Sequence, residues 1–233
     1  MPDAVVHGRQ PDAELPPVPV GRGQQIIPRP PVWSLGPSAP WTPGAELTLA
    51  QVLRAVPDVV SPVQPVSGES RPSAVLVLLT DVGDGPEMLL TRRSWEMRSH
   101  RGEVSFPGGR MDPGETALDT ALREAHEEVG LDPALVTVHG ELDHLHTAVT
   151  RSYIVPKVGT VSERLDLSAQ TSEVERVLWV PLADFTRDGA YRSEHWGVSP
   201  IERTLHFFEL EDETVWGATA RIIVDLLARA LAE

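Results

Sequence analysis

The chain has 233 residues, 41% of them hydrophobic, which suffices for one packed domain with an extension. It contains no cysteine, and this excludes disulfide bonds, thiolate zinc sites and cysteine nucleophiles. Its formal net charge of -14 disfavours a broad basic surface for nucleic acid, so an anionic partner must meet local arginines or a metal ion.

The chain has no apolar run of eighteen residues, and its first residues lack the basic start and apolar stretch of a secretory signal. We therefore expect no membrane span and a cytoplasmic protein. Lys157 is the single lysine, so the positive charge is almost entirely arginine, the better bidentate phosphate binder.

Residues 1–72 hold fifteen of the 22 prolines and neither phenylalanine nor tyrosine. This composition predicts a Pro-rich, partly irregular N-terminal extension, followed by a domain over residues 73–233. Within the extension, residues 47–56 predict a short helix with Thr48 as its N-cap. Trp33 and Trp41 are predicted to pin the extension onto the domain.

Periodicity predicts the elements of the domain. An aliphatic run predicts a buried strand at residues 74–81, which a turn at 83–86 connects to a second strand at 87–92. After several Gly and Pro breakers, a helix is predicted from Glu115 until Gly130. The remaining predictions are strands at 136–146, 154–160, 174–180 and 205–210 and a C-terminal helix at 214–232. Strands mixed with two long helices indicate an α/β or α+β fold.

The predicted helix carries three carboxylates, Glu124, Glu127 and Glu128, together on another face than its apolar stripe. Like charges one turn apart destabilise a helix unless something offsets them. Hard oxygen ligands on a rigid element suit Mg²⁺ or Mn²⁺ bound together with phosphate oxygens. The alternative is a solvated acidic face, which is the usual fate of a short charge run.

Residues 109–131 resemble the Nudix box, G-x5-E-x7-R-E-U-x-E-E-x-G-U, where U is a bulky aliphatic residue. Every fixed position matches, and the one soft departure is Ala125 at the first U position. The stretch at 89–109, LLTRRSWEMRSHRGEVSFPGG, resembles the signature upstream of the box in coenzyme A pyrophosphatases. It departs at Glu103, where that subfamily commonly has glutamine.

The resemblance implies an α/β Nudix fold, with a mixed β-sheet sandwiched between α-helices (α/β/α). It implies metal ligation by Glu124, Glu128 and the carbonyl of Gly109. Glu127 is either a ligand to a second metal ion or a group that polarises the attacking water. The general base is one of these three glutamates or a carboxylate from a later loop.

Two further positions of the box have an implied structural role. Glu115 and Arg123 would pair and hold the glycine loop against the helix, as the matching residues do in the family.

Five basic residues lie within ten positions: Arg92, Arg93, Arg98, His100 and Arg101. The functional interpretation is contact with substrate phosphates, including the 3′-phosphate of coenzyme A, and the alternative is a solvated loop. Arg93 and Arg98 rank first because they fall on signature positions.

Two weaker features stay open. His144 and His146 alternate along a predicted strand and share one face, but an HxH pair more often has a structural or surface role than a metal-binding one. His195 and Trp196 are expected in a loop, where stacking on adenine is a hypothesis.

We expect hydrolysis, dependent on Mg²⁺ or Mn²⁺, of the diphosphate bond of coenzyme A or its thioesters to 3′,5′-ADP and (acyl-)4′-phosphopantetheine. The alternative is a Nudix diphosphatase acting on ADP-ribose, NADH or dinucleoside polyphosphates. A third hypothesis is a binding module without turnover, which would be expected to lack box carboxylates. The expected partner is a small molecule, with neither nucleic acid nor membrane, and a homodimer is a family-level expectation.

Overall fold

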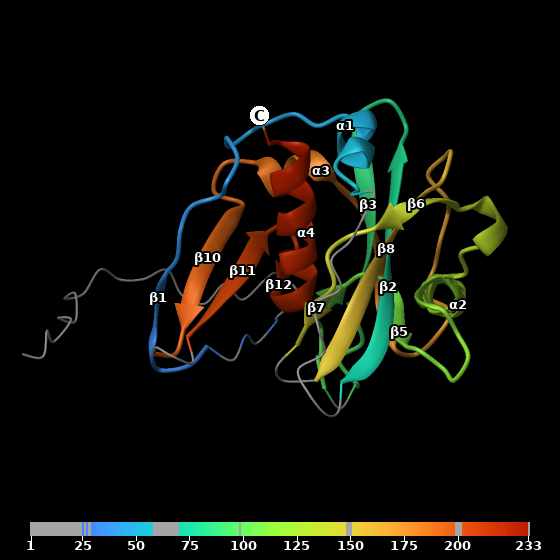
Figure 1. Ribbon diagram of the computed structural model, residues 1–233, viewed down its shortest axis with the longest axis horizontal. Helices are drawn as coiled ribbons and strands as arrows, with labels where there is room; N and C mark the ends of the chain where they lie inside the picture. Colours follow the sequence, from blue (N-terminus) through green and yellow to red (C-terminus); the bar gives the residue numbers. More distant parts are fainter. Residues whose placement is uncertain are drawn as a thin grey trace, which may run out of the picture.

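The structure is a computed structural model that describes residues 25, 27, 29–57, 70–97, 99–147, 151–198 and 202–232. Two β-sheets and their helices make up the described part (Figure 1). No helix within it is long and apolar enough to cross a membrane. Arg98, a predicted substrate-binding residue, lies outside the described residues.

The larger sheet is mixed and is built around β2 (Arg71–Asp81), its longest strand. β2 runs parallel to β8 (Ser152–Thr160) and antiparallel to β3 (Pro86–Arg93). Its strands follow the order β4-β3-β2-β8-β6, and β5, β7 and β9 pair with β2, β8 and β3. The bounds of these strands are β4 Val104–Ser105, β5 Gly108–Arg110, β6 Thr137–Glu141, β7 Leu145–His146 and β9 Val174–Pro181.

Helices cover both faces of this sheet because the alternating residues of β2 are apolar on both sides. Leu76 and Leu78 pack with the apolar stripe of α2 (Ala117–Val129). Val77 and Leu79 belong to the other core, which includes α4 (Gly217–Ala230). Figure 1 shows α2 and α4 on opposite sides of the sheet. The predicted sandwich of a mixed sheet between helices is therefore confirmed.

A second, antiparallel sheet lies on the far side of α4 and was not predicted (Figure 1). Its order is β1-β10-β11-β12. The bounds are β1 Trp33–Leu35, β10 Tyr191–Trp196, β11 Arg203–Glu209 and β12 Thr214–Trp216. The prediction of a loop at His195 and Trp196 is wrong because both lie in β10, whose polar composition hides a strand.

Two further boundaries differ from prediction. The C-terminal helix begins at Gly217 instead of residue 214, because residues 214–216 pair with β11 as an edge strand. The predicted strand over 136–146 is divided into β6 and β7. The pairing of β6 shifts register between Val138 and Gly140, and Gly140 has a φ of +148°. Leu142, which follows β6, is fully buried.

The N-terminal segment contributes to the main core. Trp41 is 7% exposed and packs against the rings of Tyr191 and Phe208. The predicted helix is confirmed as α1 (Leu49–Arg54), with a capping box at Thr48, and its Val52 is fully buried. The short helix α3 (Leu182–Thr186) completes the elements on this side. Proline-rich sequence thus packs here without long regular structure.

Candidate active site

The glycine turn before α2 brings backbone and carboxylate together. Gly108 and Gly109 form β5 and pair with Val75 and Ala74 of β2. Gly108 has φ of +154°, and a Cβ there would lie 2.7 Å from the Cα of Val75. A Cβ on Gly109 would lie 2.5 Å from Oε1 of Glu124. Glycine at position 108 therefore lets β5 pair closely with β2, and glycine at position 109 leaves room for the carboxylate of Glu124.

Helix α2 forms where the sequence predicts it, apart from its first two residues. Thr116 and Asp119 form a capping box, and Gly130 ends the helix in the left-handed conformation with φ of +76°. Ala125, the soft departure from the box, is fully buried against the sheet. Of the three box glutamates, Glu127 is the most exposed, whereas Glu128 is buried beside β5.

Glu115 and Arg123 form the pair that the resemblance implies. Nε of Arg123 donates to Oε1 of Glu115 at 2.7 Å, and Nη2 donates to Oε2 at 3.1 Å. Nη2 also reaches the carbonyl of Arg110 at 3.2 Å. The hydrogen bonds from Arg123, Asp112 and Thr120 lower the pKa of Glu115 to about 2. This bidentate pair ties the glycine loop to the helix.

The same guanidinium holds two of the three box carboxylates. Nη1 of Arg123 donates to Glu124 at 3.0 Å and to Glu127 at 3.1 Å. Burial raises the pKa of Glu124, whereas the side chain of Glu127 is 52% exposed. Glu124 and Glu127 therefore face the same side of α2.

Glu128 differs from Glu124 and Glu127 in its electrostatic environment. It is 8% exposed, and its Oε2 accepts a hydrogen bond from the backbone N–H of Gly108 at 3.3 Å. Burial raises its pKa to about 7. Within the described residues, no arginine, lysine or histidine lies within ion-pair distance of this carboxylate. A buried carboxylate of this kind is stabilised by a cation bound beside it.

The residues around Glu128 fit a divalent cation. Glu124, Glu128 and the Gly109 carbonyl supply the hard oxygen atoms that Mg²⁺ and Mn²⁺ prefer. In the part of the chain that the structure describes, no three acidic or histidine side chains already converge as a metal-binding group. Arg123 contacts one oxygen of Glu124 and one of Glu127, so each carboxylate has a second oxygen that Arg123 does not contact.

The predicted arginines occupy different environments. Arg92 contacts Glu213 at 2.5 Å and Glu175 at 3.2 Å, an arrangement that favours a structural role. The positive charge of Arg93 favours the ionised form of Glu128 and partly offsets the rise in pKa that burial causes.

Arg101 lies in the loop between β3 and β4. It donates to the carbonyl of Met97 at 2.6 Å and is exposed. His100 and Glu103, the position that departs from the subfamily signature, contact each other at 2.8 Å.

Sequence reasoning left open a carboxylate from a later loop, and the structure places Glu173 there. Glu173 contacts Arg93 at 3.3 Å, its carbonyl accepts from the N–H of Ser94, and its charge raises the pKa of Glu128. Spacing along the sequence could not place Glu173 beside Arg93, because its position depends on how the β8–β9 loop packs.

The remaining histidine and tryptophan candidates have local partners. His144 shares hydrogen bonds with the hydroxyl of Tyr153 and, at 3.1 Å, with Glu141, and the ring of His146 lies 4.9 Å from that of Tyr153. The indole N–H of Trp196 donates to the buried Glu194 at 2.7 Å. These contacts favour structural roles.

Comparison with known proteins agrees with this geometry. The model of the NUDIX domain matches residues 70–200. Nudix hydrolase 22, chloroplastic, of Arabidopsis thaliana is 37% identical over 169 residues, 69% of this chain and 55% of that protein. Nudix hydrolase 3 of Caenorhabditis elegans is 42% identical over 117 residues, 49% of each protein.

A bacterial relative is covered more fully. The uncharacterized Nudix hydrolase NudL of Photorhabdus laumondii is 35% identical over 167 residues, 71% of this chain and 88% of that protein. The chain thus spans about half the length of the plant and nematode relatives and most of the bacterial one. With an intact glycine turn, acidic helix and Glu115–Arg123 pair, the chain belongs to the Nudix family.

Proposed function

We propose that this chain is a divalent-metal-dependent hydrolase that cleaves the diphosphate bond of a nucleoside diphosphate compound. The observation that carries the proposal is the buried carboxylate of Glu128, held at the backbone of Gly108 without an ion-pair partner among the described residues. Nudix hydrolases generally use divalent metal ions, in agreement with this site.

Each residue at the site has a proposed role. Glu124, Glu128 and the carbonyl of Gly109 hold Mg²⁺ or Mn²⁺, which when bound neutralises phosphate charge and lowers the pKa of water. Glu127, the most exposed of the three glutamates, contributes to a second metal position or orients the attacking water. Glu173 faces the site through Arg93 and is a candidate for the general base.

The proposed substrate is coenzyme A or one of its thioesters, with 3′,5′-ADP and (acyl-)4′-phosphopantetheine as products. Its support is the signature at residues 89–109 together with the position of Arg93 beside Glu128. ADP-ribose, NADH and dinucleoside polyphosphates have at least equal support, because the box geometry addresses only the diphosphate that all of them contain.

Chromatographic product analysis tests the proposal. Coenzyme A, 3′-dephospho-coenzyme A, ADP-ribose, NADH and a dinucleoside polyphosphate are incubated separately with the protein and Mg²⁺ or Mn²⁺. Preferred cleavage of coenzyme A to 3′,5′-ADP would support the first substrate class. Preferred cleavage of another compound would move the assignment to the alternative. If Glu128→Gln cleaved as fast as the wild type, the metal-site assignment would fail.

A further inference from the structure

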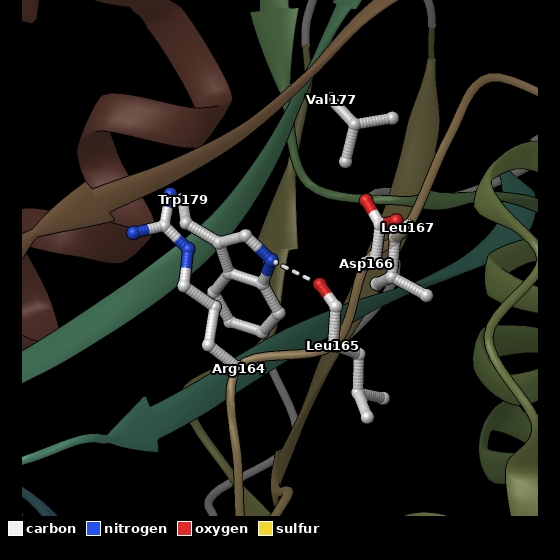
Figure 2. A pocket seen from close by; sticks show the side chains of 6 residues that line it. All are labelled: Arg164, Leu165, Asp166, Leu167, Val177 and Trp179. Atoms are coloured by element: carbon white, nitrogen blue, oxygen red, sulfur yellow. Dashed lines mark hydrogen bonds between the residues drawn. The ribbon is translucent and has the colours of Figure 1, made fainter.

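A pocket of about 320 Å³ opens beside the loop that connects β8 to β9, away from the box carboxylates. Figure 2 shows the side chains that line it. They are Arg164, Leu165, Asp166, Leu167, Val177 and Trp179. The proposed catalytic roles use none of these residues.

The pocket lies on the face of the sheet that α2 covers. Leu165, Leu167, Val177 and Trp179 all pack at the margin of the core cluster that includes the apolar residues of α2. Among the described strands, β9 pairs only with β3, so it forms the border of the described sheet next to this pocket. The pocket and the acidic helix therefore share one side of the molecule.

The loop that lines the pocket also reaches the candidate active site. The N–H of Gln170 donates to the carbonyl of Glu128 at 2.9 Å, and Glu173 contacts Arg93 at 3.3 Å. Asp166 precedes Gln170 by four residues, a segment that spans at most about 14 Å when extended. A ligand of nucleotide size can consequently occupy the pocket and extend toward Glu128.

The lining residues suit a planar ring with polar edges. The indole N–H of Trp179 donates to the carbonyl of Leu165 at 3.1 Å, which fixes the ring and leaves its apolar surface for the pocket (Figure 2). Asp166 supplies an exposed hydrogen-bond acceptor. Arg164, which pairs with Glu87 through one nitrogen at 3.2 Å, supplies donors from the rest of its guanidinium. A purely aliphatic ligand would satisfy Val177 and the leucines but would use neither charged group.

We propose that this pocket binds the nucleobase of the substrate, which is adenine in coenzyme A, ADP-ribose and NADH. The ring packs on Trp179, the exocyclic amine donates to Asp166, and the sugar and phosphates extend along the loop toward Glu128. This inference rests on the proposed function for the substrate, but the pocket can be tested by binding alone.

Calorimetry with AMP and ribose 5-phosphate on the full chain, without metal, provides that test. We expect AMP to bind and ribose 5-phosphate to bind at least tenfold more weakly, because ribose 5-phosphate lacks the base that contacts the ring of Trp179. Asp166→Asn should weaken AMP binding several-fold. Glu163→Gln is the matched control, because it removes the same charge from an exposed position of the same loop outside the pocket lining.

A second variant guards against loss of folding. Trp179→Ala should weaken AMP binding roughly tenfold. Circular dichroism verifies that this variant is folded. If Trp179→Ala unfolds, AMP binding by Asp166→Asn still tests the pocket. In steady-state hydrolysis both variants should raise KM and leave kcat nearly unchanged. Equal binding of AMP and ribose 5-phosphate, or unchanged binding by Asp166→Asn, would overturn the pocket assignment. A wild type that binds AMP in this way but hydrolyses no diphosphate would instead overturn the proposed function.

Discussion

Glu128 is costly for the protein to keep ionised. Its carboxyl is buried and its pKa is raised to about 7 by that burial, above the ordinary value of 4.5. Because the folded pKa exceeds the unfolded one, the ionised form opposes folding. The cost is absent below about pH 4.5, grows as the pH rises toward 7, and is fully present above that.

We predict that Glu128→Gln stabilises the chelator-treated protein at pH 8, by up to about 3 kcal/mol of unfolding free energy. The gain should shrink toward zero as the pH falls to 4.5. Urea denaturation at several pH values measures this difference. Glu127→Gln is the control, because that side chain is 52% exposed and its removal should change stability little. A Glu128→Gln protein less stable than the wild type at pH 8 would contradict the assignment.

Arg123 joins the glycine loop to the helix through geometry that lysine cannot reproduce. Its guanidinium bonds both oxygens of Glu115 and also Glu124 and Glu127. We predict that Arg123→Lys folds but loses roughly 10- to 100-fold in kcat/KM, as is typical when a partner that orients metal ligands is removed. Arg110→Lys serves as the control because only the backbone carbonyl of Arg110 takes part. Equal activities for the two variants would argue against an orienting role.

At the level of elements, the N-terminal segment behaves as part of the core. Trp41 packs against Tyr191 and Phe208, while β1 adds an edge to the second sheet. This segment was predicted as an extension, and the predicted helix and the pinning by Trp41 agree with the structure. Pairing with β10 had no signal in the sequence, because β1 is three residues long.

We predict that Trp41→Ala lowers the free energy of unfolding by about 3–5 kcal/mol, which is the usual cost of removing a buried large side chain. Trp33→Ala should cost much less, since Trp33 is only half-buried and the guanidinium of Arg29 lies 3.8 Å from the centre of its ring. Thermal and urea denaturation of the two variants compares them directly. Equal losses would mean that the segment is held by β1 and not by the core contact.

At the level of the whole molecule, a formal net charge of -14 raises the cost of compaction through self-repulsion. Simple salts therefore screen repulsion and stabilise the fold, and any metal effect must be separated from this screening. The three box carboxylates add to the repulsion at one face of α2. A bound divalent ion would relieve it locally.

We predict that Mg²⁺ or Mn²⁺ raises the Tm more than NaCl does at equal ionic strength. The physical reason is mass action, because an ion that binds only the folded protein adds about 2.7 kcal/mol to the free energy of unfolding at a hundredfold excess over its Kd. The double variant Glu124→Gln with Glu128→Gln should show only the salt effect. Differential scanning fluorimetry in matched buffers separates the two. An equal Tm rise in NaCl and MgCl₂ for the wild type would contradict a specific cation site.

Local features were predictable because their partners are near in sequence. The capping of α2, its end at Gly130 and the spacing that pairs Glu115 with Arg123 all follow from helical periodicity and nearby residues. The same holds for β2 and β3, whose aliphatic runs and intervening turn are continuous in the chain.

The amino-acid sequence alone determined the acidic helix, from local spacing, and the resemblance to the Nudix family, from its motif. That resemblance in turn implied the Glu115–Arg123 pair and a mixed sheet between helices. Tertiary structure alone decided the burial that raises the pKa of Glu128 and the placing of Glu173 beside Arg93. It also decided that Arg92 pairs with Glu213, 121 residues away, that β10 is a strand, and that a pocket forms at Trp179. The physical reason is that burial and long-range ion pairs depend on how distant elements pack, which no local spacing encodes.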